Sequence, residues 1–183
     1  MDALARWAGW LAVAGGALLA VMLVLVVITN PATSPAWNLF WVVVALLGAG
    51  VLGLAERARS AVGQLGQVSA WISAFGGLGL LLVAAYAIAT NQLSSGQTGP
   101  DRLWPFWIVT FGSWLGGSVG FAVALIRARS LSVLCAWLVV VGAVVGVAVS
   151  VFGGDSTALV LVFALFGVGW IVLGHAVTRQ ASG

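Results

Sequence analysis

The sequence predicts an all-α integral membrane bundle of six transmembrane helices, and three observations support this. Of the 183 residues, 62% are hydrophobic and 6% are charged, whereas about 25% of the residues in soluble domains are charged. The apolar residues gather into six runs, each close to the length of about 20 residues that crosses a hydrocarbon core. The runs lack the alternation of apolar and polar residues that β-barrel strands require.

The first three predicted spans are Trp7–Thr29, Trp37–Ala55 and Leu65–Ala89. The first run, at about 23 residues, is longer than the 7 to 15 of a signal-peptide core, so we expect it to remain as a span. Two prolines in 30–36 predict a turn before the second span, and Arg57-Ala58-Arg59-Ser60 forms a basic turn after it.

The last three predicted spans are Trp104–Ile126, Leu131–Phe152 and 156–177. The longest polar stretch, 90–103, precedes the fourth span, and a second Arg-Ala-Arg-Ser, at 127–130, follows it. The six spans use up most of the chain. We therefore expect a single transmembrane domain over residues 1–183, with no separate soluble domain.

The arginines predict the orientation. Six lie on one side of the predicted bundle, and Arg102 lies on the other: the six are Arg6, Arg57, Arg59, Arg127, Arg129 and Arg179. By the positive-inside rule, both termini face the cytoplasm. The abundance of Ala, Gly and Val, with arginine but no lysine, indicates a high-GC bacterium. The predicted location is therefore the inner (plasma) membrane.

The odd-numbered spans resemble one another. Each has a tryptophan followed by a glycine five residues later: Trp10 and Gly15, Trp71 and Gly76, Trp137 and Gly142. Three tandem two-helix hairpins explain this most simply, and chance matching in an apolar alphabet is the alternative. Because each unit has two spans, the copies would run parallel, as a pseudo-threefold ring or in series.

Small residues recur every four positions in most spans, which places them on one helix face. Such rows let helix backbones approach closely in lipid. The strongest row is in the fourth span: Gly112, Gly116, Gly120 and Ala124. Packing within the chain is the favoured interpretation of this row, and a homo-oligomer contact is the alternative.

The sequence predicts no catalytic residue, no bound cofactor and no metal ligand. No Asp, Glu, Lys or Arg lies inside a predicted span, which argues against ion-coupled transport and against paired carboxylates. His175, the sole histidine, could serve as general base only for a serine nucleophile nearby. Ser113 would lie about 15 Å from it in depth. Ser118 comes closer, but no third side chain is available to orient the imidazole. Cys135, the sole cysteine, excludes an intrachain disulfide and is expected to pack as a small apolar residue.

Polar and aromatic side chains leave two functions open. The candidates for lining a cavity, or equally for bonding helices together, are Asn38, Gln67, Ser69, Ser73, Trp71, Tyr86, Thr110, Ser113, Trp114, Ser118, Ser132, Trp137 and Trp170. The leading prediction is a non-enzymatic accessory, scaffold or stress-response protein that acts through lipid contacts and through a membrane-protein partner or a second copy of itself. The alternative is a subunit that binds or transports a small uncharged ligand in a Trp-lined pocket. No basic patch for nucleic acid is present.

Overall fold

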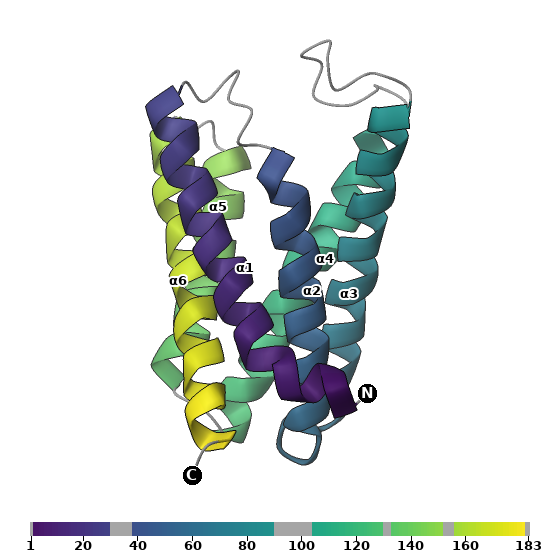
Figure 1. Cartoon of the computed structure of the whole chain (residues 1–183), viewed down its shortest axis with the longest axis vertical. Coiled ribbons are helices and arrows are strands. Elements are labelled where there is room, and N and C mark those ends of the chain that lie inside the picture. The colour runs from purple at the N-terminus through teal and green to yellow at the C-terminus, as the bar shows by residue number, and fades with distance from the viewer. Residues whose placement is uncertain (1, 30–37, 90–103, 130–132, 152–155, 182–183) are drawn as a thin grey trace.

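The described part of the chain is entirely helical. The computed structural model describes residues 2–29, 38–89, 104–129, 133–151 and 156–181. These residues form six α-helices (Figure 1): α1 (Asp2–Thr29), α2 (Leu39–Arg57), α3 (Arg59–Ala89), α4 (Trp104–Ala128), α5 (Val133–Val151) and α6 (Ser156–Ala181). The predicted all-α class is confirmed. The predicted span ends at Trp37, Leu131 and Phe152 lie outside the described residues.

Four helices are long and apolar enough to cross a membrane. Their apolar stretches are Trp7–Thr29, Leu39–Arg57, Arg59–Tyr86 and Pro105–Ala128. Over the residues that can be described, the apolar parts of α5 and α6 are shorter: Val133–Ala148 and Phe163–Thr178. The chain therefore has the character of a helical membrane protein.

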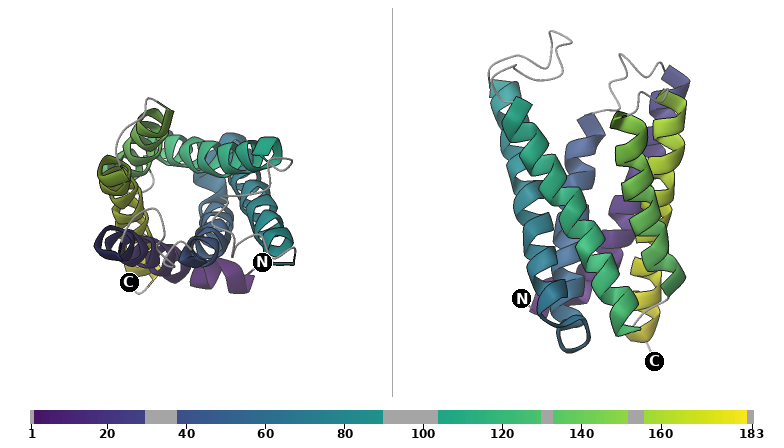
Figure 2. Two further views of the ribbon diagram at one scale, coloured as in Figure 1. Left: turned by 90° about the horizontal axis from the view of Figure 1, so that it is seen from above. Right: turned by 180° about the vertical axis from the view of Figure 1, so that it is seen from behind.

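The helices form a closed ring in chain order. Each helix packs against the next one in the sequence, and α6 packs against α1. Seen from above, α1, α2, α4, α5 and α6 border a common centre, and α3 lies on the outer side of α2 and α4 (Figure 2). Both termini lie at the end of the bundle where α2 turns into α3 (Figure 1). The first and last helices are therefore neighbours, while the predicted triplication of a hairpin stays a prediction.

The three consecutive helix pairs share the same packing contacts. In each pair, the glycine five residues after the matching tryptophan faces the partner helix, and a Cβ there would come within 3.0 Å of it. The contacts are Gly15 with Leu47, Gly76 with Trp114 and Gly142 with Phe166. One turn closer to the tryptophan, a second contact repeats: Ala12 with Gly50, Ser73 with Gly117 and Val139 with Gly169. The matching tryptophans themselves are exposed, by 59%, 44% and 50% in chain order.

The turn between α2 and α3 differs from the predicted four-residue loop. Ala58 alone separates the two helices, and its N–H donates to the carbonyl oxygen of Leu54 at 2.9 Å. The direction changes at Gly63 inside α3, where φ is 60° and ψ is −162°. This region of backbone conformation is accessible almost only to glycine. The basic residues therefore continue a helix, and the glycine makes the turn.

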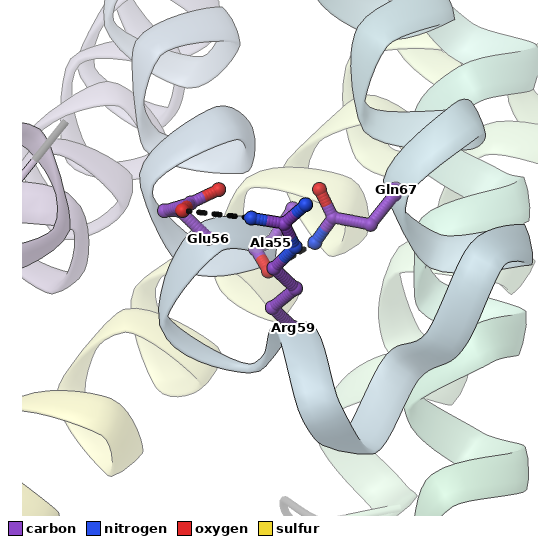
Figure 3. Close-up of polar contacts among 4 residues, drawn as sticks. All are labelled: Ala55, Glu56, Arg59 and Gln67. Carbon is purple, nitrogen blue, oxygen red and sulfur yellow. Dashed lines mark hydrogen bonds and ion pairs between the residues drawn. The ribbon is translucent and has the colours of Figure 1, made fainter.

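Two side-chain contacts hold this turn together (Figure 3). Gln67 Nε2 donates to the carbonyl oxygen of Ala55 at 2.6 Å, and Arg59 Nη1 lies 3.6 Å from Glu56 Oε1. The amide satisfies one of the carbonyl groups that a helix leaves unpaired at its C-terminus. Gln67, one of the candidate pocket residues, is thus a structural residue at the end of the bundle.

The second Arg-Ala-Arg-Ser copy has a different conformation. Here α4 ends at Ala128, and Arg129 is left-handed with φ of 49°. Its N–H donates to the carbonyl oxygen of Ile126 at 3.3 Å, which closes the helix end in the manner usually reserved for glycine. Residues 57–59 thus join two helices, whereas the same three residue types at 127–129 end one.

Candidate functional site

Five aromatic side chains from α2, α4 and α6 meet inside the ring, and we call them the aromatic cluster: Phe40, Phe111, Trp114, Phe166 and Trp170. Trp114 is central, with ring centroids 5.9 Å from Phe40 and 5.8 Å from Phe166, both edge to face. Phe166 in turn meets Trp170 at 6.1 Å, again edge to face. Aromatic pairs in this geometry are each worth about 0.5–1.5 kcal/mol beyond their buried area.

Two buried serines fix the position of Trp114. The hydroxyl groups of Ser73 on α3 and Ser118 on α4 lie 3.0 and 2.9 Å from the carbonyl oxygen of Trp114, and 3.0 Å from each other. Both serines are almost completely buried. The hydroxyl groups therefore bond α3 to α4 at the depth where the tryptophan enters the cluster.

Within the described helices, the indole N–H groups of Trp114 and Trp170 have no acceptor. Their side chains are 1% and 0% exposed, and neither Nε1 atom has a hydrogen-bond partner among the described residues. An unsatisfied buried donor costs about 1–3 kcal/mol, so native proteins rarely keep one without a reason. These two donors are the unusual chemical feature of the interior.

One position on α2, a turn beyond Val44, is buried and unfilled. Phe40, Val44 and Gly48 are spaced by four and share one face of α2. The first two residues of this face point toward Trp114: Phe40 contacts its ring, and Val44 lies with Trp114 Cδ1 around Gly77. Gly48 is buried, yet a Cβ built on it would meet no described heavy atom within 4 Å. The face that reaches Trp114 therefore ends in an unfilled position.

The four tryptophans considered for a pocket separate into two groups. Trp114 and Trp170 are buried in the aromatic cluster, whereas Trp71 and Trp137 lie about half exposed on the outside of the bundle. The structure therefore does not bring all four around one space. The outer pair belongs to the repeated exposed positions of the odd-numbered helices.

The polar candidates are also divided. Ser69, Ser73, Thr110 and Ser118 are buried. Thr110 Oγ1 donates within its own helix, to the carbonyl oxygens of Phe106 and Trp107 at 2.9 and 3.1 Å. Asn38 and Tyr86 are exposed, Ser113 is half-buried, and Ser132 lies outside the described residues.

The structure does not pair His175 with a serine. Its side chain is exposed on α6, while Ser118 is 1% exposed and bonded to Ser73 and Trp114. Cys135 is buried as a free thiol. In the part of the chain that was searched, no three His, Cys, Asp or Glu side chains lie together as a metal site would require.

The glycine row of α4 serves two surfaces. Gly120 and Ala124 face α3, where Gly120 lies against Ser69 and Ala124 against Gly66. Gly112 and Gly116 are exposed and have no described atom within 4 Å of an added Cβ. Gly120 and Ala124 thus serve packing within the chain, and Gly112 and Gly116 remain open for a contact with another copy.

The sequence alone did not single out Phe40, Gly48 or Phe166. A usable signal was the four-residue spacing of Phe166 and Trp170, which puts both on one face of a helix. Gly48 carried no such signal, because one glycine in an apolar run looks like the next.

Comparisons with protein-family models, with curated proteins and with solved structures find no match for this chain.

Proposed function

We propose that this protein is a non-enzymatic membrane component that acts by associating with a second copy of itself or with another membrane protein. The observation that supports this proposal is that the glycines of α4 lie on two different surfaces. Gly120 packs inside the chain, whereas Gly112 and Gly116 leave an open, small-residue surface on the outside. Surfaces of this kind allow close helix association in lipid, where packing replaces the hydrophobic effect as the driving force.

Native mass spectrometry of the protein, gently extracted from its own membrane, tests this proposal. We expect an oligomer or a co-purifying membrane protein. Gly116→Leu projects a side chain from the open surface, so it should abolish the association without unfolding the chain. Trp71→Leu, on the exposed side of α3, is the control and should keep the association. A monomer that carries only a non-lipid small molecule would contradict the scaffold function.

We further propose that the chain crosses the inner membrane six times with both termini in the cytoplasm. The positive-inside rule supports this orientation, as does the placement of both termini at the end of the bundle that carries Arg57 and Arg59 (Figure 1).

Cysteine labelling in a Cys135→Ala background tests the topology. In spheroplasts, whose inner membrane is intact, a membrane-impermeant maleimide should label Gln97→Cys and Asp155→Cys. Ser60→Cys and Ser130→Cys should react only after permeabilisation. Labelling of Asp155→Cys from the cytoplasmic side would contradict the fifth and sixth spans, and reversal of the whole pattern would contradict the orientation.

A second function, binding of a small uncharged molecule, is favoured by one observation: the unpaired indole donors of Trp114 and Trp170. Trp71 and Trp137 are exposed and cannot line an interior pocket. Of the four candidate tryptophans, only Trp114 and Trp170 therefore remain as pocket residues.

A further inference from the structure

We propose that the aromatic cluster binds neutral, membrane-soluble molecules whose carbonyl oxygens accept hydrogen bonds from the buried indole N–H groups of Trp114 and Trp170. This inference rests on the second function above, small-molecule binding, and names its site and its chemistry. It starts from the two buried donors that lack an acceptor. A complementary ligand must supply acceptors, and a carbonyl oxygen has two lone pairs and no proton of its own to satisfy.

A water molecule complements this site less well. Buried waters generally make about three hydrogen bonds and donate as well as accept. The five rings of the aromatic cluster carry no oxygen that could accept the protons of a water bonded to an indole N–H. An acceptor without protons avoids that cost.

The site also selects against charge. The described Asp, Glu and Arg side chains lie at helix ends, at Glu56, Arg57, Arg59, Arg127 and Arg129. An anion on the indole donors would therefore be buried with no opposite charge, which is far more costly than burying a neutral polar group.

Depth places the site within the hydrocarbon layer. Trp114 lies ten residues after the start of α4, and Trp170 lies fourteen residues after the start of α6, which is about 15 and 21 Å along the two helices. Both donors would thus lie well inside a core about 30 Å thick. The ester carbonyls of lipids lie near the surface of the bilayer, so the ligand is a molecule dissolved among the acyl chains.

Room for the ligand begins at Gly48. It is buried, continues the face of α2 that reaches Trp114, and has no described atom within 4 Å of an added Cβ. A leucine at this position should therefore fill the ligand's space without pushing a helix away. This separates loss of the site from loss of the fold.

The probes are acetophenone, which carries a carbonyl group, and ethylbenzene, which has the same shape without it. The full-length protein is labelled with ¹⁵N-tryptophan in detergent micelles, and the indole resonances of Trp114 and Trp170 are assigned from the Trp114→Phe and Trp170→Phe variants. Acetophenone should move both indole proton resonances downfield, as expected for a new hydrogen bond, and should bind more tightly than ethylbenzene.

Each Trp→Phe variant should weaken acetophenone binding about three- to tenfold, the value of one neutral hydrogen bond, and leave ethylbenzene binding unchanged. Trp71→Phe should change neither. Gly48→Leu should abolish the binding of both probes while the thermal transition is kept, and Ala45→Leu, which adds the same side chain on the exposed side of the same helix, should have no effect on binding.

Equal affinity for the two probes, or unshifted indole resonances in their presence, would overturn the proposal. So would acetophenone binding that survives Gly48→Leu. If native mass spectrometry finds a retained small molecule but Trp114 and Trp170 do not respond to the probe, the binding function stands and this site is wrong.

Discussion

Gly76 sets the distance between α3 and α4. A Cβ at this position would lie 2.6 Å from the carbonyl oxygen of Thr110, 2.8 Å from the carbonyl carbon of Ser113, and against the backbone nitrogen of Trp114. All three obstacles are backbone atoms, which cannot rotate out of the way as a side chain could. The close approach allows Ser73 to reach the carbonyl oxygen of Trp114.

We therefore expect Gly76→Ala to destabilise the protein by about 1–3 kcal/mol, the usual cost of overpacking a closely packed interior. Thermal unfolding in detergent measures this. Gly112→Ala is the matched control, because it adds the same methyl group to α4 where nothing lies within 4 Å among the described atoms. Equal transition temperatures for the two variants would show that α3 and α4 are not in close contact at Gly76.

At the scale of the helix, α3 owes its direction to one backbone conformation. Gly63 has φ of 60° and ψ of −162°, and beyond it the helix runs back along α2, with Gln67 bonded to Ala55. An added Cβ at Gly63 would meet no described atom within 4 Å. Any effect of a substitution there must come from the backbone.

Gly63→Ala should destabilise the protein by about 1–3 kcal/mol, because alanine rarely adopts this conformation. The measurement is again thermal unfolding in detergent. Gln64→Ala, one residue later and also exposed, should have little effect. If Gly63→Ala unfolds at the same temperature as the unchanged protein, the turn between α2 and α3 must be made elsewhere.

At the scale of the whole molecule, the ring depends on the contact between α1 and α6. Glycines form it from both sides: a Cβ at Gly9 would lie 2.7 Å from Thr178 Cγ2, and one at Gly167 would lie 3.1 Å from the carbonyl oxygen of Gly16. This contact joins the two ends of the chain. A series of hairpins without closure would leave α1 and α6 apart.

Oxidation of the double variant Gly9→Cys/Thr178→Cys, in a Cys135→Ala background, should produce an intramolecular disulfide. It is detected as faster migration of the monomer on a non-reducing gel. The pair Gly112→Cys/Thr178→Cys should not cross-link, because Gly112 lies in the first half of α4 and Thr178 lies in the last turn of α6. Absence of the first cross-link would contradict ring closure.

The sequence by itself determined the helical class, the position of most helices and the residues that repeat among them. Composition suffices for this, because an apolar run of membrane length can satisfy its backbone hydrogen bonds only within itself, as a helix. The repeat of Gly15, Gly76 and Gly142 was also visible, since the spacing from each tryptophan is local.

The tertiary structure alone decided which of two similar residues lies inside. Trp71 and Trp114 are equally apolar and lie in equally apolar runs, but one is exposed and the other buried. In so apolar a chain the inner and outer faces of a helix look alike in sequence, because both face an apolar environment. The faces are distinguished by packing: close backbone contacts at glycines turn one side of each helix inward. The same packing left the two indole donors without an acceptor among the described residues. It also made residues 57–59 a junction between two helices and residues 127–129 the end of one.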